Sequence, residues 1–249
     1  MIDLLLPPAV VTEETYGDDE ADQAPLYPEE ERVVARSVAK RRREFAAVRG
    51  CARRAMARLG VPPAPVLPGE RGAPQWPAGL VGSMTHCRGY RAAALSRSGD
   101  LASLGIDAEP HGPLPDGVLP AVALPAERRR LALLRTGRPT VHWDRLLYSA
   151  KESVYKAWFP LTGRWLDFEQ ADIDLHLSPD ATSTGHFHAE LLVPGPLLAG
   201  RRLTCFDGRW TVARGLVATA VTVRHVPAPP GPPGCCSWTP RGPGALRSD

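Results

Sequence analysis

Two of the three lysines in this chain lie with a glutamate in the segment 146–160. Glu152 and Lys156 are four residues apart, so on a helix their side chains share one face, with Lys151 beside them. An isolated pair at this spacing is usually a solvated ion pair. Composition argues for more here, because the other 27 of the 30 basic residues are arginines. A compact, titratable ammonium that contacts a phosphate oxygen and donates a proton is a use for which arginine is a poor substitute.

A second pair of acidic residues lies in the segment 101–109, which reads as a strand ending at Pro110. The two-residue period of a strand places Asp107 and Glu109 on one face. Two carboxylates so close repel each other unless a cation lies between them. An octahedral Mg²⁺ completed by a substrate phosphate suits this spacing. A strand end that turns into solvent suits it equally well.

Phosphate ligands are the third kind of candidate. The segment 81–87 contains Thr85 and His86, whose hydroxyl, imidazole and backbone N–H groups could all donate to a phosphate as the chain enters a strand. The run Lys40–Arg43 and Arg49 add guanidinium groups that match phosphate geometry. Most basic side chains on such a face are simply solvated. The glycines in 69–74 do not have the spacing of a P-loop.

Two helices must position these groups. The catalytic candidates require a helix over 146–160, for which Ser149 is a candidate N-cap and Pro160 the stop. Apolar residues recurring at threes and fours predict another helix over 29–59, with Gly50 as a point where it could break.

Strands make up most of the remaining ordered chain. They are predicted near 10–11 and over 91–95, 101–109, 171–177, 186–193, 202–206 and 210–223, with a Pro- and Gly-rich loop at 60–79 and a Pro-rich loop within 113–140. The order predicts an α+β fold of two halves, each with a helix and a small sheet. We expect halves at 1–104 and 105–226, followed by a disordered Pro/Gly-rich tail at 227–249.

Composition narrows the functional class. A net charge of +3, with 43% hydrophobic and 23% charged residues, is ordinary for a globular protein and too small to indicate a nucleic-acid binder. No apolar run approaches a membrane span of ~20 residues, and the first residues do not read as a signal peptide. Five cysteines without C-x-x-C spacing favour a reducing cytoplasm over disulfides or zinc. His186 and His188 are expected to be surface residues.

Three segments in fixed order now suggest a family: Gly-Ser-Met-Thr-His-Cys at 82–87, Gly-Ile-Asp-Ala-Glu at 105–109, and Trp143 through Lys-Glu-Ser-Val-Tyr-Lys at 151–156. Between about 37 and 223 the chain resembles the Sfp-type 4′-phosphopantetheinyl transferases, in particular the branch with EntD-like enzymes. The resemblance implies two similar α/β halves related by a pseudo-twofold, with coenzyme A bound at their interface. It also implies transfer of the phosphopantetheine arm to a serine of an acyl or peptidyl carrier protein.

The resemblance further implies roles for individual residues. It implies a Mg²⁺ site (Mn²⁺ being the alternative) at Asp107, the main chain of Ala108, Glu109 and Glu152. It implies a coenzyme A site at Arg41, Arg49, Gly69, Glu70, Arg71, Thr85, His86, Asp107, Glu152, Lys156 and Leu166, with Leu166 beside the pantetheine arm. Glu152 is expected to accept the proton of the carrier serine, and Lys156, Lys151 and His86 to stabilise the departing bisphosphate. Pro68 departs from the pattern, because relatives can carry a lysine there.

Carrier proteins of this kind are acidic, so Arg128–Arg130, Arg88 and Arg91 are candidate docking residues for a transient complex. We expect a monomer that binds neither nucleic acid nor membrane. Two alternatives stay open at this point. One is another Mg²⁺-dependent phosphoryl or nucleotidyl transferase, and the other is an Arg-rich nucleic-acid-binding module, which lacks aromatic residues on its basic face.

Overall fold

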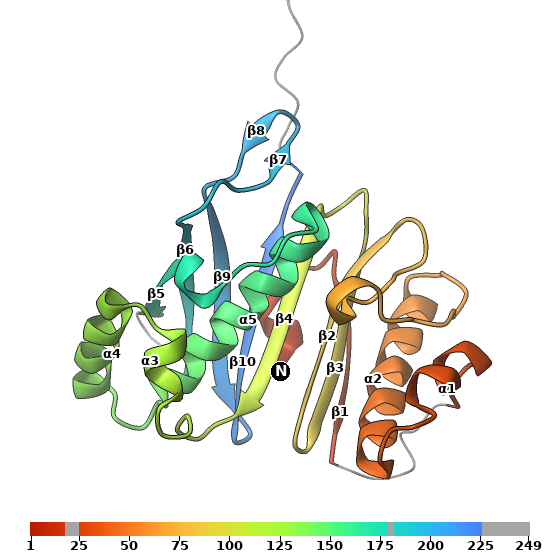
Figure 1. Ribbon diagram of the computed structural model, residues 1–249, viewed down its shortest axis with the longest axis horizontal. Coiled ribbons are helices and arrows are strands. Elements are labelled where there is room, and N and C mark those ends of the chain that lie inside the picture. The colour runs from red at the N-terminus through yellow and green to blue at the C-terminus, as the bar shows by residue number, and fades with distance from the viewer. Residues whose placement is uncertain (18–24, 179–181, 226–249) are drawn as a thin grey trace, which may run out of the picture.

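Two antiparallel sheets, each covered by a 20-residue helix, form the two halves of the protein (Figure 1). The computed structural model describes residues 1–17, 25–178 and 182–225, so the predicted tail at 227–249 lies outside the described residues. The predicted α+β architecture is confirmed. The halves share a plan but differ in size, since one sheet has three strands and the other five.

The N-terminal half is built on the sheet β1-β3-β2. Its elements are β1 (Val11–Tyr16), α1 (Pro28–Val34), α2 (Ala39–Arg58), β2 (Leu80–Cys87) and β3 (Tyr90–Arg97), with short 3-10 turns at Ile2–Leu5 and Glu70–Gly72. Helix α2 lays Cys51, Ala52, Ala55 and Met56 on the sheet, all fully buried. The small side chains of Cys51, Ala52 and Ala55 let the helix approach the strands closely.

The single helix predicted over 29–59 is in fact two helices. The break falls at residues 35–38 rather than at Gly50, which is buried within α2. Val38 has an extended backbone and caps α2. The break lets α1 fold back on α2, where the fully buried carboxylate of Glu30 accepts a 2.8 Å hydrogen bond from Arg53. A continuous helix could not bring these two side chains together.

The C-terminal half is built on the sheet β4-β10-β9-β6-β5. Its elements are β4 (Ser103–Pro110), α3 (Val118–Val122), α4 (Pro125–Gly137), α5 (Trp143–Thr162), β5 (Ala171–Leu177), β6 (Thr184–Leu191), β7 (Leu197–Leu198), β8 (Arg201–Arg202), β9 (Cys205–Ala213) and β10 (Leu216–Val223), with a 3-10 turn at Phe168–Gln170. Helix α5 crosses the face of β4 and β10, and its buried Trp158 lies in the same core as Trp210 of β9. Helices α3 and α4 lie at the outer edge of this half (Figure 1).

Helix α5 is longer at both ends than predicted. It begins at Trp143, so Ser149 is not its N-cap but a buried residue whose hydroxyl lies 3.0 Å from that of Thr219 on β10. Pro160 lies inside the last turn, where its missing N–H removes the hydrogen bond to the carbonyl of Lys156 without ending the helix. The helix ends instead at Gly163, which has a left-handed backbone (φ 62°).

Two other predictions are corrected in this half. Residues 113–140 contain α3 and α4, because Pro120 and Pro125 lie in first turns, where a missing N–H is tolerated. The strand predicted over 210–223 is a hairpin of β9 and β10. Arg214 and Gly215 both have positive φ (53° and 72°), as a tight two-residue turn requires.

The two halves meet where β2 runs beside β4 (Figure 1). Side-chain hydroxyls join the two strands at this seam. Ser83 accepts from the amide of Ile106 at 3.0 Å, and Thr85 accepts from the amide of Ala108 at 3.1 Å. Strand β4 spans the predicted boundary between residues 104 and 105, and that boundary stays a prediction.

Helix α5 sits very close to β4 at Gly105. A Cβ atom there would lie 2.0 Å from the carbonyl oxygen of Ser153, so no larger residue fits without moving the helix. This contact fixes the position of α5 two residues from Asp107. Among the described residues, no helix has the length and apolar character needed to cross a bilayer.

Candidate functional site

A pocket of about 800 Å³ lies along the seam between the halves. This volume is in the range typical of small-molecule sites. Its walls come from the end of α1, from α2, from the loop 68–76 and from β2 on one side, and from β4 and α5 on the other. The predicted residues that line it are Arg41, Arg49, Arg71, Thr85, His86, Asp107, Glu152 and Lys156. Segments far apart in the chain therefore meet at this pocket.

The wall from the N-terminal half carries most of the positive charge. Arg41 on α2 donates from Nη1 to His86 Nε2 at 3.0 Å. Arg49 is only 6% exposed, its Nε donates to the carbonyl of Val66 at 3.0 Å, and burial lowers its pKa to about 10. Arg71 has a left-handed backbone (φ 51°) and lies 5.3 Å from the ring of Trp165, across the seam. Three guanidinium groups thus face one cavity, a pattern that suits a polyanion.

The wall from the C-terminal half carries the carboxylates. Lys156 donates to Asp107 Oδ1 at 2.7 Å and to the carbonyl of Ile106 at 3.1 Å. Thr85 donates to the same Oδ1 at 3.3 Å. Asp107 Oδ2 is buried without a hydrogen-bond partner, although such atoms are nearly always satisfied in proteins. Lys156 therefore holds one oxygen of Asp107 and leaves the other available.

Glu152 lies one helical turn before Lys156 and lines the same pocket. Burial raises the pKa of Glu152; the nearby Lys156 lowers it and the charge of Asp107 raises it again. Burial likewise raises the pKa of Glu109, with Asp107 adding to the effect and Arg145 opposing it. A carboxylate whose pKa is raised toward neutrality is suited to accept a proton during a reaction.

The predicted convergence of Asp107, Glu109 and Glu152 on one point is not present. Over residues 1–17, 25–178 and 182–225, no group of three or more His, Cys, Asp or Glu is arranged to hold a metal ion. Glu109 does not line the pocket, because Arg145 Nη1 holds its carboxylate at 3.2 Å. The carboxylates repel one another, and Lys156 and Arg145 are the cations that neutralise them here.

The donor chemistry nevertheless fits a hard divalent cation at part of this set. The unpartnered Oδ2 of Asp107 and the partly buried carboxylate of Glu152 are oxygen donors of the kind that Mg²⁺ prefers. The main chain of Ala108, predicted to lie beside the metal, is engaged in the seam, where its amide donates to Thr85.

Lys151, predicted to be catalytic, does not line the pocket. Its ammonium is buried on the opposite side of α5, 2.9 Å from Glu127 Oε2, and it donates to the carbonyls of Phe168 and Ala171. Glu127 in turn accepts from the amides of Leu124 and Ile173, both at 2.7 Å. These two side chains, 2% and 0% exposed, connect α4, α5 and β5. Lys151 is therefore a structural residue behind the catalytic helix.

Three other predicted contacts do not line the pocket. Leu166 is buried in the core beneath α5, so it does not form a pocket wall. Gly69 and Glu70 belong to the loop over the pocket but do not line it. Pro68, Arg71 and the segment 72–74 of the same loop face the cavity instead. A tight turn, in which the amide of Gly69 donates to the carbonyl of Ala73 at 2.7 Å, determines which residues point inward.

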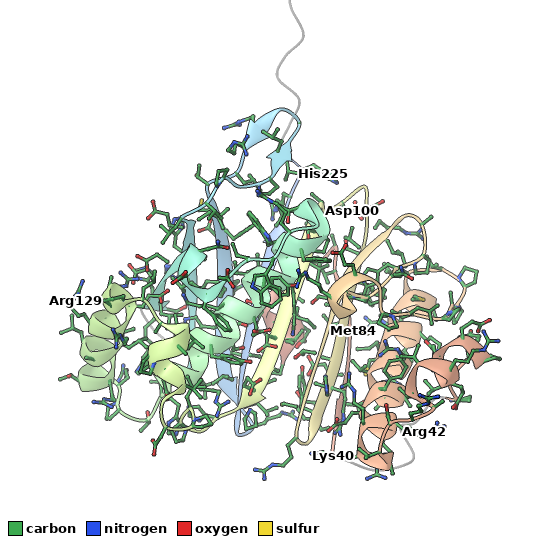
Figure 2. The ribbon with its side chains drawn as sticks, viewed as in Figure 1. Lys40, Arg42, Met84, Asp100, Arg129 and His225 are labelled. Atoms are coloured by element: carbon green, nitrogen blue, oxygen red, sulfur yellow. The ribbon has the colours of Figure 1, made fainter. Side chains whose placement is uncertain are left out.

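Two arginines predicted to dock a carrier protein are occupied elsewhere. Arg91 is buried and donates to the carbonyl of Gly17 at 2.7 Å. Arg130 is paired with Asp172. Arg88, Arg128 and Arg129 are exposed. Figure 2 shows Arg129 at the opposite end of the molecule from Arg42, with Met84 of the pocket wall between them.

Some pocket residues were not predicted. Glu44 on α2 faces His86, and Tyr155 and Phe159 on α5 line the apolar part of the cavity. Tyr155 and Phe159 lie three and seven residues after Glu152, so the period of the helix could have placed them on the same face. No comparable signal marked Glu44, which reads as one acid within a basic run.

Comparison with known proteins finds two family models that match successive parts of the chain. Residues 29–96 match the family model described as the 4′-phosphopantetheinyl transferase N-terminal domain, and residues 103–194 match that of the 4′-phosphopantetheinyl transferase superfamily. The chain is 61% identical to the 4′-phosphopantetheinyl transferase Svp of Streptomyces mobaraensis (90% of this chain, 89% of Svp). It is 52% identical to PptT of Mycobacterium tuberculosis (88% and 96% covered).

Similarity to the EntD-like branch is more limited. Enterobactin synthase component D of Salmonella typhi is 34% identical over 118 residues, which is 47% of this chain and 48% of that protein. The near-full-length matches to Svp and PptT are the stronger relationship.

Proposed function

The chain belongs to the 4′-phosphopantetheinyl transferase superfamily, and from this premise we propose how its pocket works. It is a transferase that moves the 4′-phosphopantetheine arm of coenzyme A to a serine of an apo carrier protein, which leaves adenosine 3′,5′-bisphosphate. Family membership sets aside the nucleic-acid-binding alternative and that of a different phosphoryl or nucleotidyl transferase. The observation that carries the proposed mechanism is the pocket itself, with guanidinium groups on one wall and carboxylates on the other.

The bisphosphate end of coenzyme A binds at the N-terminal wall in this proposal. Arg41, Arg49 and Arg71 supply permanent positive charge, and His86 lies among them. Guanidinium groups bind phosphate oxygens in a bidentate manner, so three of them fix the orientation of the phosphates. This places the pyrophosphate toward Asp107 and Lys156 on the other wall.

Glu152 accepts the proton of the carrier serine, and Lys156 neutralises the departing bisphosphate. Burial raises the pKa of Glu152, which makes the carboxylate a stronger base than an exposed one. The Lys156 ammonium, 2.7 Å from Asp107, already faces the cavity and needs only a small side-chain rotation to reach a phosphate oxygen. Catalysis of this kind depends mainly on positioning and charge neutralisation.

We propose Mg²⁺ as the metal cofactor, with Mn²⁺ as an alternative. Asp107 through Oδ2 and Glu152 are the residues that would hold the ion, whereas Arg145 Nη1 occupies Oε2 of Glu109. When bound, a divalent ion there neutralises charge on the pyrophosphate oxygens. The fit rests on the unpartnered Oδ2 of Asp107 and on the oxygen-donor chemistry of the two carboxylates.

Further properties belong to the same proposal. The protein acts in the cytoplasm as a monomer, and its carrier proteins are acidic partners that bind transiently. The exposed Arg88, Arg128 and Arg129 on a chain of net charge +3 support electrostatic attraction of such a partner. Docking at Arg128 and Arg129 would require a carrier large enough to extend from the end of α4 to the seam.

The test is incubation of the full chain with coenzyme A, Mg²⁺ and an apo carrier protein. The expected result is a mass gain of one phosphopantetheine arm on the carrier serine, with release of adenosine 3′,5′-bisphosphate. Glu169→Gln, which alters an exposed glutamate outside the pocket, is the matched control for Glu152→Gln. A carrier that gains no mass, or gains it equally with Glu152→Gln, contradicts the proposal.

A further inference from the structure

An acidic side chain on the basic wall of the pocket has no role in the mechanism above. Glu44 lies on α2 one turn after Arg41, and its side chain is 14% exposed. Its Oε2 is 3.9 Å from His86 Nε2, and its Oε1 is 3.9 Å from Lys40 Nζ. A carboxylate beside a phosphate site repels the ligand, so its presence there calls for a physical reason.

The protonation state of His86 supplies that reason. An arginine side chain can only donate hydrogen bonds, so His86 Nε2, 3.0 Å from Arg41 Nη1, must be the acceptor. His86 is therefore neutral in the free protein, with its proton on Nδ1. Partial burial and the charge of Arg41 lower its pKa, Lys156 and Arg91 lower it further, and Glu44 raises it. Burial and three cations, opposed by one carboxylate, lower the pKa of the imidazole.

A bound bisphosphate changes this balance. Its phosphate oxygens compete with His86 Nε2 for the Arg41 guanidinium, because a charged acceptor binds arginine more strongly than an imidazole nitrogen does. Nε2 then loses its donor and faces a carboxylate and an anionic ligand. Both favour the protonated ring.

We propose that binding of the bisphosphate end of coenzyme A is coupled to uptake of one proton by His86, with Glu44 as the positioning residue that holds the resulting imidazolium. The proton comes from solvent, Nε2 becomes a donor, and no other bond changes. The inference rests on the proposed function, since it takes the bisphosphate of coenzyme A as the ligand of this wall. The inference explains why a carboxylate that would repel the ligand lies on this wall: Glu44 stabilises the protonated His86.

A pH dependence of binding follows from this linkage. The pH window lies between the pKa of His86 in the free protein and its higher pKa in the complex. As pH rises through this window, affinity for the bisphosphate falls by up to about tenfold per pH unit. Outside that window the protonation of His86 is the same in the free protein and the complex, so it no longer makes the affinity depend on pH. The effect is a property of binding and is measurable without carrier protein or metal.

The experiment is calorimetric titration of the full chain with adenosine 3′,5′-bisphosphate at pH 7.5, in two buffers of different ionisation enthalpy. Wild type should take up about 0.5 to 1 proton per ligand relative to His86→Gln, which corrects for titration of the ligand's own phosphates. Glu44→Gln should lose at least about half of that uptake. Glu44→Asp should keep most of it, and Glu29→Gln, an exposed position on α1, should equal wild type.

Other outcomes would contradict the proton uptake, the role of Glu44 or the proposed function. If Glu44→Gln tightens binding equally at pH 6 and pH 8.5 with unchanged proton uptake, Glu44 is only a repulsive charge and the inference is wrong. Binding by wild type without proton uptake also overturns the inference but leaves the proposed function intact. If wild type does not bind the bisphosphate at all, the proposed function of this wall fails as well.

Discussion

Replacing Lys151 by methionine separates a structural lysine from a catalytic one. Methionine keeps most of the side-chain volume but removes the ammonium that lies 2.9 Å from Glu127. Both side chains are almost fully buried, so the variant leaves a carboxylate in the core without its cation. Breaking a buried pair from one side typically costs about 3 to 5 kcal/mol of unfolding free energy. Two backbone amides still donate to Glu127, which places the expected loss toward the lower end.

The loss of unfolding free energy in Lys151→Met should increase as pH rises. Burial already raises the pKa of Glu127, and Lys151 is the main opposing charge. Without Lys151 the folded-state pKa rises further above the unfolded value. A carboxyl group of this kind is more easily protonated in the folded state, so stability falls as pH rises above the unfolded pKa, by up to about 1.4 kcal/mol per pH unit until the folded pKa is passed. The variant should therefore be closest to wild type near pH 5 and furthest from it near pH 8.

Urea denaturation at pH 5 and pH 8 measures this difference. Adding Glu127→Gln to Lys151→Met should recover part of the loss at pH 8, because the unpaired charge is gone. The folded fraction of Lys151→Met should keep kcat within about threefold of wild type, since the ammonium lies behind α5 and outside the pocket. Unchanged stability together with a hundredfold loss in kcat would refute the structural role of Lys151.

Three further outcomes are expected. Glu152→Gln and Lys156→Ala should each lower carrier modification by about 10²–10³ while the circular dichroism spectrum stays close to wild type, and near-normal turnover by either would contradict its role. Lys156→Ala should also lower the urea midpoint, because it leaves the buried carboxylate of Asp107 without its cation. Gly105→Ala should cost about 3 kcal/mol or more by urea denaturation, because the new Cβ meets the backbone of α5, and a loss below about 1 kcal/mol would show that α5 moves freely on β4. Ser83→Ala removes the acceptor for the buried amide of Ile106 and should cost about 1 to 3 kcal/mol in the same assay, whereas an unchanged midpoint would mean that the seam does not depend on this hydroxyl.

Local patterns in the sequence predicted the parts of the site that depend on one element. Asp107 lies on a strand, Glu152 and Lys156 share one face of a helix, and the pocket contains all three. The family resemblance predicted that these elements meet at an interface. Strand alternation also placed Asp107 and Glu109 on one side of β4, but could not show that Arg145 holds Glu109 away from the cavity.

What sequence reasoning missed depends on contacts between distant segments. Ser83 reads as part of a phosphate-binding segment, yet its hydroxyl satisfies an amide 23 residues later in the chain. Glu44 looks like an ordinary acid until β2 brings His86 against it. Within 113–140 the sequence predicted only a Pro-rich loop, because the local pattern does not reveal that Pro120 and Pro125 lie in the first turns of helices. In each case the partner that decides the role is absent from the local sequence.

The two lysines of α5 show how a correct chemical inference can carry a wrong position. At 100° per residue, Lys156 lies about 40° from Glu152 around the helix, whereas Lys151 lies about 140° from Lys156. The spacing therefore already separates them onto different faces. Both nevertheless use an ammonium where arginine would fit poorly, because their acceptors converge on a single point: Glu127 and two carbonyls for Lys151, and Asp107 and one carbonyl for Lys156. A planar guanidinium cannot direct its donors to one compact site. The scarcity of lysine in this chain therefore marks the requirement for a point charge, and only the three-dimensional environment decides whether that charge serves the core or the reaction.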